Sequence, residues 1–188
     1  MDRSKLLHLT WPQRGWGYMP PTREIFEIFQ DIEKICAPRR IFEFGFHAGH
    51  STTYMLESFP GSTINTIGLS SPTQEASVYM KNKYGDRINI FLQDSATINL
   101  EKNYYDFALV DGNHRYSHAL SDIQKTMRAN VPFTLIDNCE TTNVAKAVKE
   151  CYDNNHKFQL LKTYEYYVCW NNVSQWNQMK MYKRIDYS

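Results

Sequence analysis

Two acidic residues stand directly after short apolar runs in the second half of the chain. Asp111 follows the run 106–110 and has His114 three residues later, while Asp137 and Asn138 end the next such run. Two carboxylates and an amide oxygen are hard ligands that suit Mg²⁺ or another divalent cation. The imidazole of His114 titrates near neutrality and can take a proton from a substrate hydroxyl. The sequence therefore predicts a metal site at Asp111, Asp137 and Asn138, with catalytic roles for His114 and Asp111.

A glycine-containing turn follows an earlier apolar run. Gly45 and Gly49 come after the run 41–44, and Ser51 opens a hydroxyl-rich stretch. Glycine lets a ligand approach bare backbone, and the N-terminus of a following helix offers free N–H groups. Open α/β sheets bind nucleoside-type ligands at such an edge. We expect a cofactor at this turn, contacted by Gly45, His47, Gly49 and Ser51.

The elements that must position these groups alternate along the chain. Apolar strand-like runs lie at 40–44, 63–69, 87–92, 106–110 and 133–137. A first helix is expected after the N-cap candidate Thr22, with apolar residues at helical spacing from Ile25 to Ile35 and an end at Pro38. Further helix-like runs lie at 52–58, 73–83, 116–129 and 143–154. This alternation predicts a parallel, doubly wound sheet with right-handed crossovers. The tail differs, because 158–170 and 178–185 read as an antiparallel hairpin joined by 171–175.

The turn and the acids together resemble a known family. Glu43-x-Gly45-x-x-x-Gly49-x-Ser51 resembles the first cofactor motif of class I S-adenosylmethionine-dependent methyltransferases. The resemblance implies a Rossmann-like, doubly wound seven-stranded sheet, parallel with a C-terminal antiparallel hairpin, in which Glu43 holds the glycine turn. Asp111 with Asp137-Asn138 is similar to the metal site of the catechol and caffeoyl-coenzyme A O-methyltransferases. Residues 111–116 also resemble the Asp-Gly-x-His-x-Tyr pattern of a related bacterial group.

The same resemblance implies further cofactor contacts and one departure. Met19 matches a methionine in the loop over the sulfonium of S-adenosylmethionine, and Asp94 and Ser95 match the edge that contacts adenine. The acid that binds the ribose hydroxyls is missing, because Gly68 stands where the second strand ends. Ser70 or Ser71 is expected to replace it in part. Residues 1–20 are expected to form an arm or lid and residues 21–188 the methyltransferase-like domain.

Composition limits the partners. The 21 basic and 20 acidic residues give a net charge of +1, which indicates neither nucleic acid nor an anionic membrane as a partner. The chain has no apolar run long enough to span a membrane and no signal-like start, which predicts a cytoplasmic protein. The four scattered cysteines are expected to be buried free thiols. A homodimer remains open, since the terminal hairpin could offer a free edge.

These features favour an enzyme that transfers a methyl group from S-adenosylmethionine to a small-molecule hydroxyl, assisted by Mg²⁺. Two alternatives stay open. The loss of an acid at Gly68 is compatible with a non-catalytic binding protein of the same fold. Acids at strand ends also cap helices or shape pockets, so a metal-independent methyltransferase is the other alternative.

Overall fold

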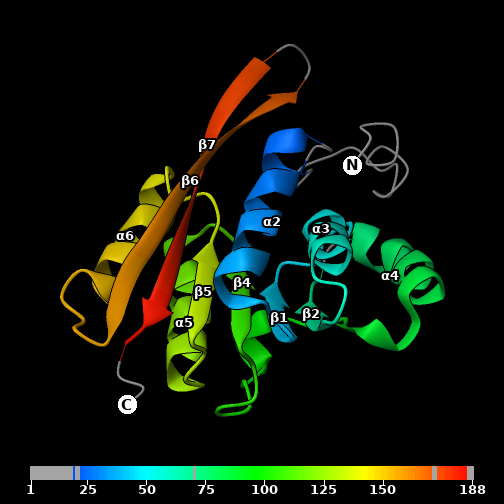
Figure 1. Cartoon of the computed structure of the whole chain (residues 1–188), viewed down its shortest axis with the longest axis horizontal. Coiled ribbons are helices and arrows are strands. Elements are labelled where there is room, and N and C mark those ends of the chain that lie inside the picture. Colours follow the sequence, from blue (N-terminus) through cyan, green and yellow to red (C-terminus); the bar gives the residue numbers. More distant parts are fainter. Residues whose placement is uncertain (1–18, 20–21, 70, 171–172, 186–188) are drawn as a thin grey trace.

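The structure is a computed structural model that describes residue 19 and residues 22–69, 71–170 and 173–185. In these residues seven strands form one sheet in the order β3-β2-β1-β4-β5-β7-β6 (Figure 1). The strands are β1 (Arg40–Phe44), β2 (Thr63–Ile67), β3 (Ile88–Phe91), β4 (Phe107–Val110), β5 (Phe133–Ile136), β6 (Phe158–Trp170) and β7 (Val173–Arg184). The first five are parallel and β7 runs antiparallel between β5 and β6. The predicted fold is confirmed.

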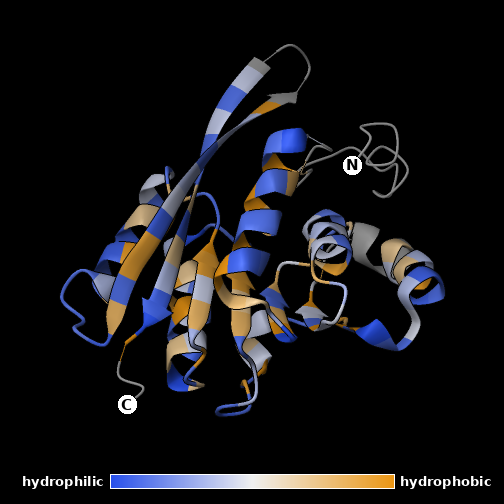
Figure 2. Ribbon diagram, in the orientation of Figure 1, coloured by the Kyte–Doolittle hydropathy of each residue, from blue (hydrophilic) through white to orange (hydrophobic). Residues whose placement is uncertain are grey.

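One helix precedes the first strand and the others follow strands along the chain. They are α2 (Arg23–Cys36), α3 (His50–Ser58), α4 (Ser71–Tyr84), α5 (Tyr116–Arg128) and α6 (Thr142–Tyr152), with short 3₁₀ turns η1 (Gly85–Arg87) and η2 (Ser95–Thr97). The side chain of Thr22 caps α2 by accepting a hydrogen bond from the backbone N–H of Ile25. Polar and apolar residues alternate in bands along α2, as expected for a helix with one buried face (Figure 2).

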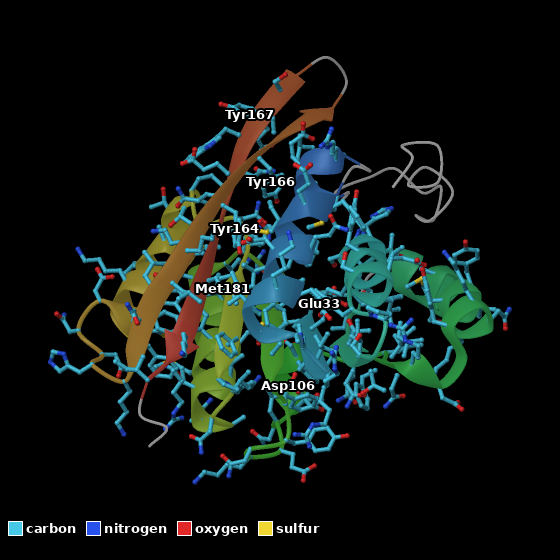
Figure 3. The ribbon with its side chains drawn as sticks, in the orientation of Figure 1. Glu33, Asp106, Tyr164, Tyr166, Tyr167 and Met181 are labelled. Carbon is cyan, nitrogen blue, oxygen red and sulfur yellow. The ribbon has the colours of Figure 1, made fainter. Side chains whose placement is uncertain are left out.

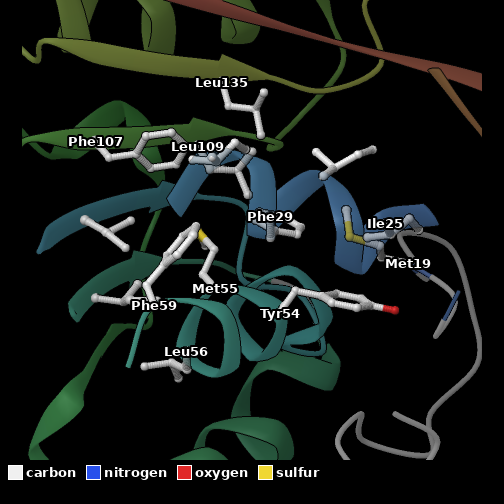
Figure 4. Packing of buried hydrophobic residues seen from close by; sticks show 14 of the residues in the cluster. Met19, Ile25, Phe29, Tyr54, Met55, Leu56, Phe59, Phe107, Leu109 and Leu135 are labelled. Atoms are coloured by element: carbon white, nitrogen blue, oxygen red, sulfur yellow. The ribbon is translucent and has the colours of Figure 1, made fainter. Parts of the chain in front are cut away.

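Two apolar cores lie on opposite faces of the sheet. Successive strand residues divide between them, so that Ile41 and Leu135 join one core while Phe42 and Ile136 join the other. This division explains why β4, with the sequence Phe-Ala-Leu-Val, is apolar throughout rather than alternating. The first core packs against α2, α3 and α4, and contains the stacked rings of Phe29 and Tyr54 (Figure 4). The second packs against α5 and α6.

The hairpin differs from its prediction in length. Val173, Ser174 and Gln175 are not part of a connecting loop, because they pair with Trp170, Cys169 and Val168. The sequence signal was weak here because residues 171–175 are polar apart from Val173, although a strand needs only backbone hydrogen bonds to continue. β6 has its predicted bounds and 13 residues. β7 has 12 residues and begins at Val173, five residues before the predicted start at 178.

A β-bulge interrupts β6 near its start. Leu160 pairs with Tyr182 and Lys162 pairs with Met181, so Leu161 is an extra residue with no partner of its own. Below the bulge Phe158 packs with the α5–α6 core. Above it Tyr164 and Tyr166 belong to the α2–α3–α4 core.

The remaining predictions concern the cysteines, the N-terminal arm and membrane-spanning segments. Cys139 and Cys151 are buried free thiols and Cys36 is half-buried, as expected, while the side chain of Cys169 lies outside the described residues. Most of the predicted arm, residues 1–18, also lies outside them. Among the described residues, no helix is both long enough and apolar enough to cross a membrane.

Candidate active site

The turn after β1 brings three strands together. Gly45 has φ +108°, and a Cβ there would lie 1.9 Å from the carbonyl oxygen of Asp111. The N–H groups of Gly45 and Phe46 both donate to the carbonyl of Ile67 at the end of β2. Glycine at 45 is therefore required by the backbone of β4, whether or not a ligand is present. Gly49, at φ +75°, is the N-cap of α3.

Glu43 lies beneath this turn and is fully buried. Its carboxylate accepts hydrogen bonds from the hydroxyl groups of Ser51 and Thr66, each at 2.5 Å, and from that of Thr52. Burial raises the pKa of Glu43 to about 7, although the three hydroxyl donors oppose the shift. These contacts join β1 to α3 and β2, and they direct the Ser51 hydroxyl toward Glu43.

A cavity of about 950 Å³ opens at the carboxyl ends of the parallel strands. Ten of the residues predicted to form the site line it, namely Met19, Gly45, His47, Ser51, Asp94, Ser95, Asp111, His114, Asp137 and Asn138. Glu43 and Gly49 do not line it, and Ser70 lies outside the described residues. The site predicted as separate motifs is thus brought to one edge of the sheet. Met19 is buried in the α2–α3–α4 core close to Ile25 (Figure 4).

Asp111 and His114 form the first pair of titrating groups in the cavity. Nε2 of His114 lies 3.6 Å from Oδ1 of Asp111, and the Asp111 side chain is 20% exposed. Asp111 raises the pKa of His114, while burial opposes that shift. Burial also raises the pKa of Asp111, and the neighbouring His114 opposes this shift. The imidazole is therefore held beside a carboxylate that favours its protonated form.

Asp137 lies deeper, at the end of the neighbouring strand β5. Oδ1 accepts the hydroxyl of Tyr166 at 2.8 Å and the N–H of Asn138 at 2.8 Å, and Oδ2 lies 3.0 Å from the same hydroxyl. Burial, followed by the charge of Asp111, raises the pKa of Asp137 well above its usual range. The amide nitrogen of Asn138 donates to Glu140 at 3.4 Å, which leaves its amide oxygen as an acceptor.

The opposite end of the cavity is formed by β2 and β3. Gly68 and Leu69 follow β2, and the Leu69 side chain is 65% exposed. Asp94 caps η2 by accepting the N–H of Ala96 at 2.9 Å. The hydroxyl of Ser95 donates to Asp122 at 3.3 Å. The described residues directly after β2, Gly68 and Leu69, carry no carboxylate, as the sequence indicates.

Asp122, Tyr166 and Asn177 are among the polar residues of the cavity that the sequence did not predict. Asp122 lies on α5, is buried and has a pKa raised to about 6, chiefly by burial. Tyr166 and Asn177 pair across the hairpin, and the buried Oδ1 of Asn177 has no hydrogen-bond partner among the described residues. Asp122 could not be recognised from the sequence, because its link to the predicted site is a hydrogen bond with Ser95, 27 residues away. No local signal indicates the other two, because they reach the cavity through strand pairing.

The sequence matches the family model of a methyltransferase domain over residues 42–137, just over half of the chain. The chain belongs to the methyltransferase domain family. No curated protein sequence matches this methyltransferase. The predicted class I methyltransferase is confirmed, and with it the prediction of an enzyme.

Solved structures show the same fold at low identity. An O-methyltransferase from Bacillus cereus, in complex with S-adenosylhomocysteine, has 15% identity and a TM-score of 0.66, over 97% of this chain and 90% of that one. A tRNA (m1A58) methyltransferase from Aquifex aeolicus has 15% identity and a TM-score of 0.66, over 99% and 77%. An S-adenosylmethionine-dependent O-methyltransferase from Thermotoga maritima has 11% identity and a TM-score of 0.64, over 99% and 72%. These relatives differ in substrate, so they do not identify the acceptor.

Proposed function

We propose that this methyltransferase transfers a methyl group from S-adenosylmethionine to a hydroxyl of a small molecule, with the help of Mg²⁺. The observation that carries the proposal is the shared edge of the sheet: Asp111 and Asp137 end adjacent strands inside the cavity that also receives the glycine turn. Class I methyltransferases need a cofactor and an acceptor side by side, since methyl transfer depends on alignment of oxygen, methyl and sulfur. A cavity of about 950 Å³ has room for both.

The residues present suit a hard divalent cation. Asp111 and Asp137 are close enough for the charge of Asp111 to raise the pKa of Asp137, and a cation would relieve that repulsion. No cluster of three or more His, Cys, Asp or Glu side chains is found in the described part of the chain. A cation here would therefore also use the amide oxygen of Asn138 and water, as Mg²⁺ commonly does. When bound, the metal would lower the pKa of the acceptor hydroxyl.

His114 is the residue that would take the acceptor proton. It lines the cavity beside Asp111 and its side chain is 46% exposed, so a proton accepted there can pass to water. Asp111 would then have a second role, because its charge stabilises the imidazolium that forms.

The cofactor would lie between the glycine turn and η2. The methionine end would face Gly45, His47 and Asp111, and the adenine would face Asp94 and Ser95. Ribose recognition would be weak, because the residue after β2 is Gly68 rather than an acid.

The charges in the cavity favour a small acceptor over nucleic acid. Among the described lining residues there is no Lys or Arg, whereas four are aspartates. Nucleic-acid binding depends on cations that neutralise phosphates. A small molecule without anionic groups therefore suits this cavity better than RNA.

Calorimetric titration with S-adenosylhomocysteine, with and without Mg²⁺, tests the cofactor site. A transfer assay with labelled S-adenosylmethionine and a panel of hydroxyl-bearing small molecules tests the reaction. Cofactor binding together with transfer that chelation abolishes would support the proposal. No binding at millimolar cofactor would support the non-catalytic alternative suggested by Gly68. Transfer that survives chelation and Asp137→Ala would support the metal-independent alternative.

A further inference from the structure

The hairpin extends past the carboxyl edge of the sheet. The last pair between β5 and β7 joins Ile136 to Lys180, so the residues of β7 that precede Lys180 continue beyond β5 (Figure 1). Tyr166 pairs with Asn177 in this extension and Val168 pairs with Gln175. All four side chains line the cavity. The hairpin is thus one wall of the site that contains Asp137.

The pairing with β7 decides which side of β6 faces that wall. Tyr164 and Tyr166 pack with the α2–α3–α4 core and are 7% and 3% exposed. Tyr167, the next residue, is 68% exposed on the other side of the strand. Figure 3 shows the three tyrosines along β6. The hydroxyl of Tyr166 therefore enters the site from a segment 29 residues beyond Asp137.

The contact of Tyr166 with Asp137 is specific. One hydroxyl lies 2.8 Å from Oδ1 and 3.0 Å from Oδ2, so it spans both oxygens of the carboxylate. The N–H of Asn138 also donates to Oδ1. The phenolic hydroxyl of Tyr166 is the donor in its contacts with Asp137, because a carboxylate only accepts. Oδ2 accepts fewer hydrogen bonds than Oδ1 and retains capacity for another partner.

We propose that Tyr166 is a positioning residue of the metal centre, which fixes the Asp137 carboxylate so that it can hold the divalent cation. This inference rests on the proposed metal role of Asp137. Side chains that hold a metal are usually oriented by hydrogen bonds from a neighbouring group, and loss of such a group typically lowers metal affinity about 10- to 100-fold. Tyr166 occupies that place, and it makes the hairpin part of the metal centre.

The test compares two tyrosine variants of the full chain in the presence of S-adenosylhomocysteine. In Tyr166→Phe the hydroxyl on Asp137 is lost. In Tyr164→Phe a hydroxyl is lost from the same strand, two residues away, where it donates to Asp31 at 2.7 Å instead. Mn²⁺ serves as the probe, its binding followed by the loss of the free-ion signal in electron paramagnetic resonance.

We expect Tyr166→Phe to raise the Kd for Mn²⁺ about 10- to 100-fold and to broaden the spectrum of bound Mn²⁺. We expect Tyr164→Phe to bind Mn²⁺ within twofold of the unaltered protein, and both variants to keep their affinity for S-adenosylhomocysteine. Mn²⁺ binding by Tyr166→Phe within threefold of the unaltered protein, or tighter, would overturn the inference alone. No Mn²⁺ binding by the unaltered protein would overturn the metal role of Asp137 and this inference together.

A second measurement is made on the unaltered protein. In protein labelled with ¹³C at the tyrosine Cζ atoms, the Tyr166 resonance of the unaltered protein is the one that is missing from the spectrum of Tyr166→Phe. Addition of Mg²⁺ should shift this resonance and leave that of Tyr164 in place. An unchanged Tyr166 resonance under conditions where Mg²⁺ binds would show that the hydroxyl does not respond to the metal, and would reject the proposal.

Discussion

The two ends of the cavity are built differently. At the end formed by β4 and β5, the carboxylate of Asp137 is buried and accepts hydrogen bonds from two donors. At the end formed by β2 and β3, Leu69 is mostly exposed and no acid follows β2 in the described residues. Buried polar groups are retained only where their geometry is fixed. The comparison indicates that the polar groups are held tightly at one end, while the other end lacks the acid that would bind ribose in our proposal.

The largest effect should come from the buried acid. Asp137→Asn would keep the size of the side chain but remove the charge that would hold the proposed cation. We expect kcat/KM to fall by two to three orders of magnitude, corresponding to about 3–4 kcal/mol. Asp153→Asn removes an exposed acid at the end of α6 and serves as the control. Equal activity in the two variants would place the chemistry elsewhere.

His114 is expected to have the next largest effect. His114→Ala should lower turnover about 100-fold while leaving the affinity for S-adenosylhomocysteine nearly unchanged. Asp111 raises the pKa of His114, and a cation held by Asp111 would oppose that shift. Because only the neutral imidazole accepts a proton, turnover should increase as pH rises through the pKa that His114 has in the Mg²⁺-bound enzyme. Steady-state rates measured across pH would check both points. A pH profile that stays the same in His114→Ala would remove this residue from the mechanism.

At the end of the cavity formed by β2 and β3, a substitution should tighten the binding of S-adenosylhomocysteine. Gly68→Asp would restore an acid after β2 that can accept both ribose hydroxyls. Charge-assisted hydrogen bonds contribute about 1.5–3 kcal/mol, so the affinity for S-adenosylhomocysteine should rise about 10- to 100-fold. Gly68→Ala separates this gain from any effect on the backbone. If calorimetry finds no tighter binding in Gly68→Asp than in Gly68→Ala, the ribose lies elsewhere.

The smallest effect concerns the hairpin wall. The buried Oδ1 of Asn177 has no hydrogen-bond partner in the part of the chain that the structure describes, and a buried polar atom left unpaired lowers stability. Asn177→Leu, of similar shape, should stabilise the free protein by about 1 kcal/mol and raise Tm by about 2–4 °C. Thermal unfolding followed by circular dichroism would measure this. A lower Tm would mean that the amide is satisfied within the protein and has no need of a ligand.

The parts of the molecule that could be predicted are those encoded locally. The turn from Glu43 to Ser51 and the acids at Asp111 and Asp137 each stand within a few residues of the strand that places them, so pattern and spacing were sufficient. The wall formed by Tyr166 and Asn177 could not be predicted, because it depends on strand pairing. Simple alternation counted from Phe158 would place Tyr166 on the α5–α6 side, and the bulge at Leu161 reverses that assignment.

The bulge in β6 also affects which insertions and deletions this protein can tolerate as its sequence evolves. Leu161 is opposed by no residue of its own, whereas Leu160 and Lys162 keep consecutive partners on β7. Deletion of this one residue would leave every other pair in place, including the pair that presents Tyr166 to Asp137. The strand can therefore gain or lose a residue here without altering the active-site wall above it. Length variation in relatives of this chain should concentrate at this position rather than along the rest of the hairpin.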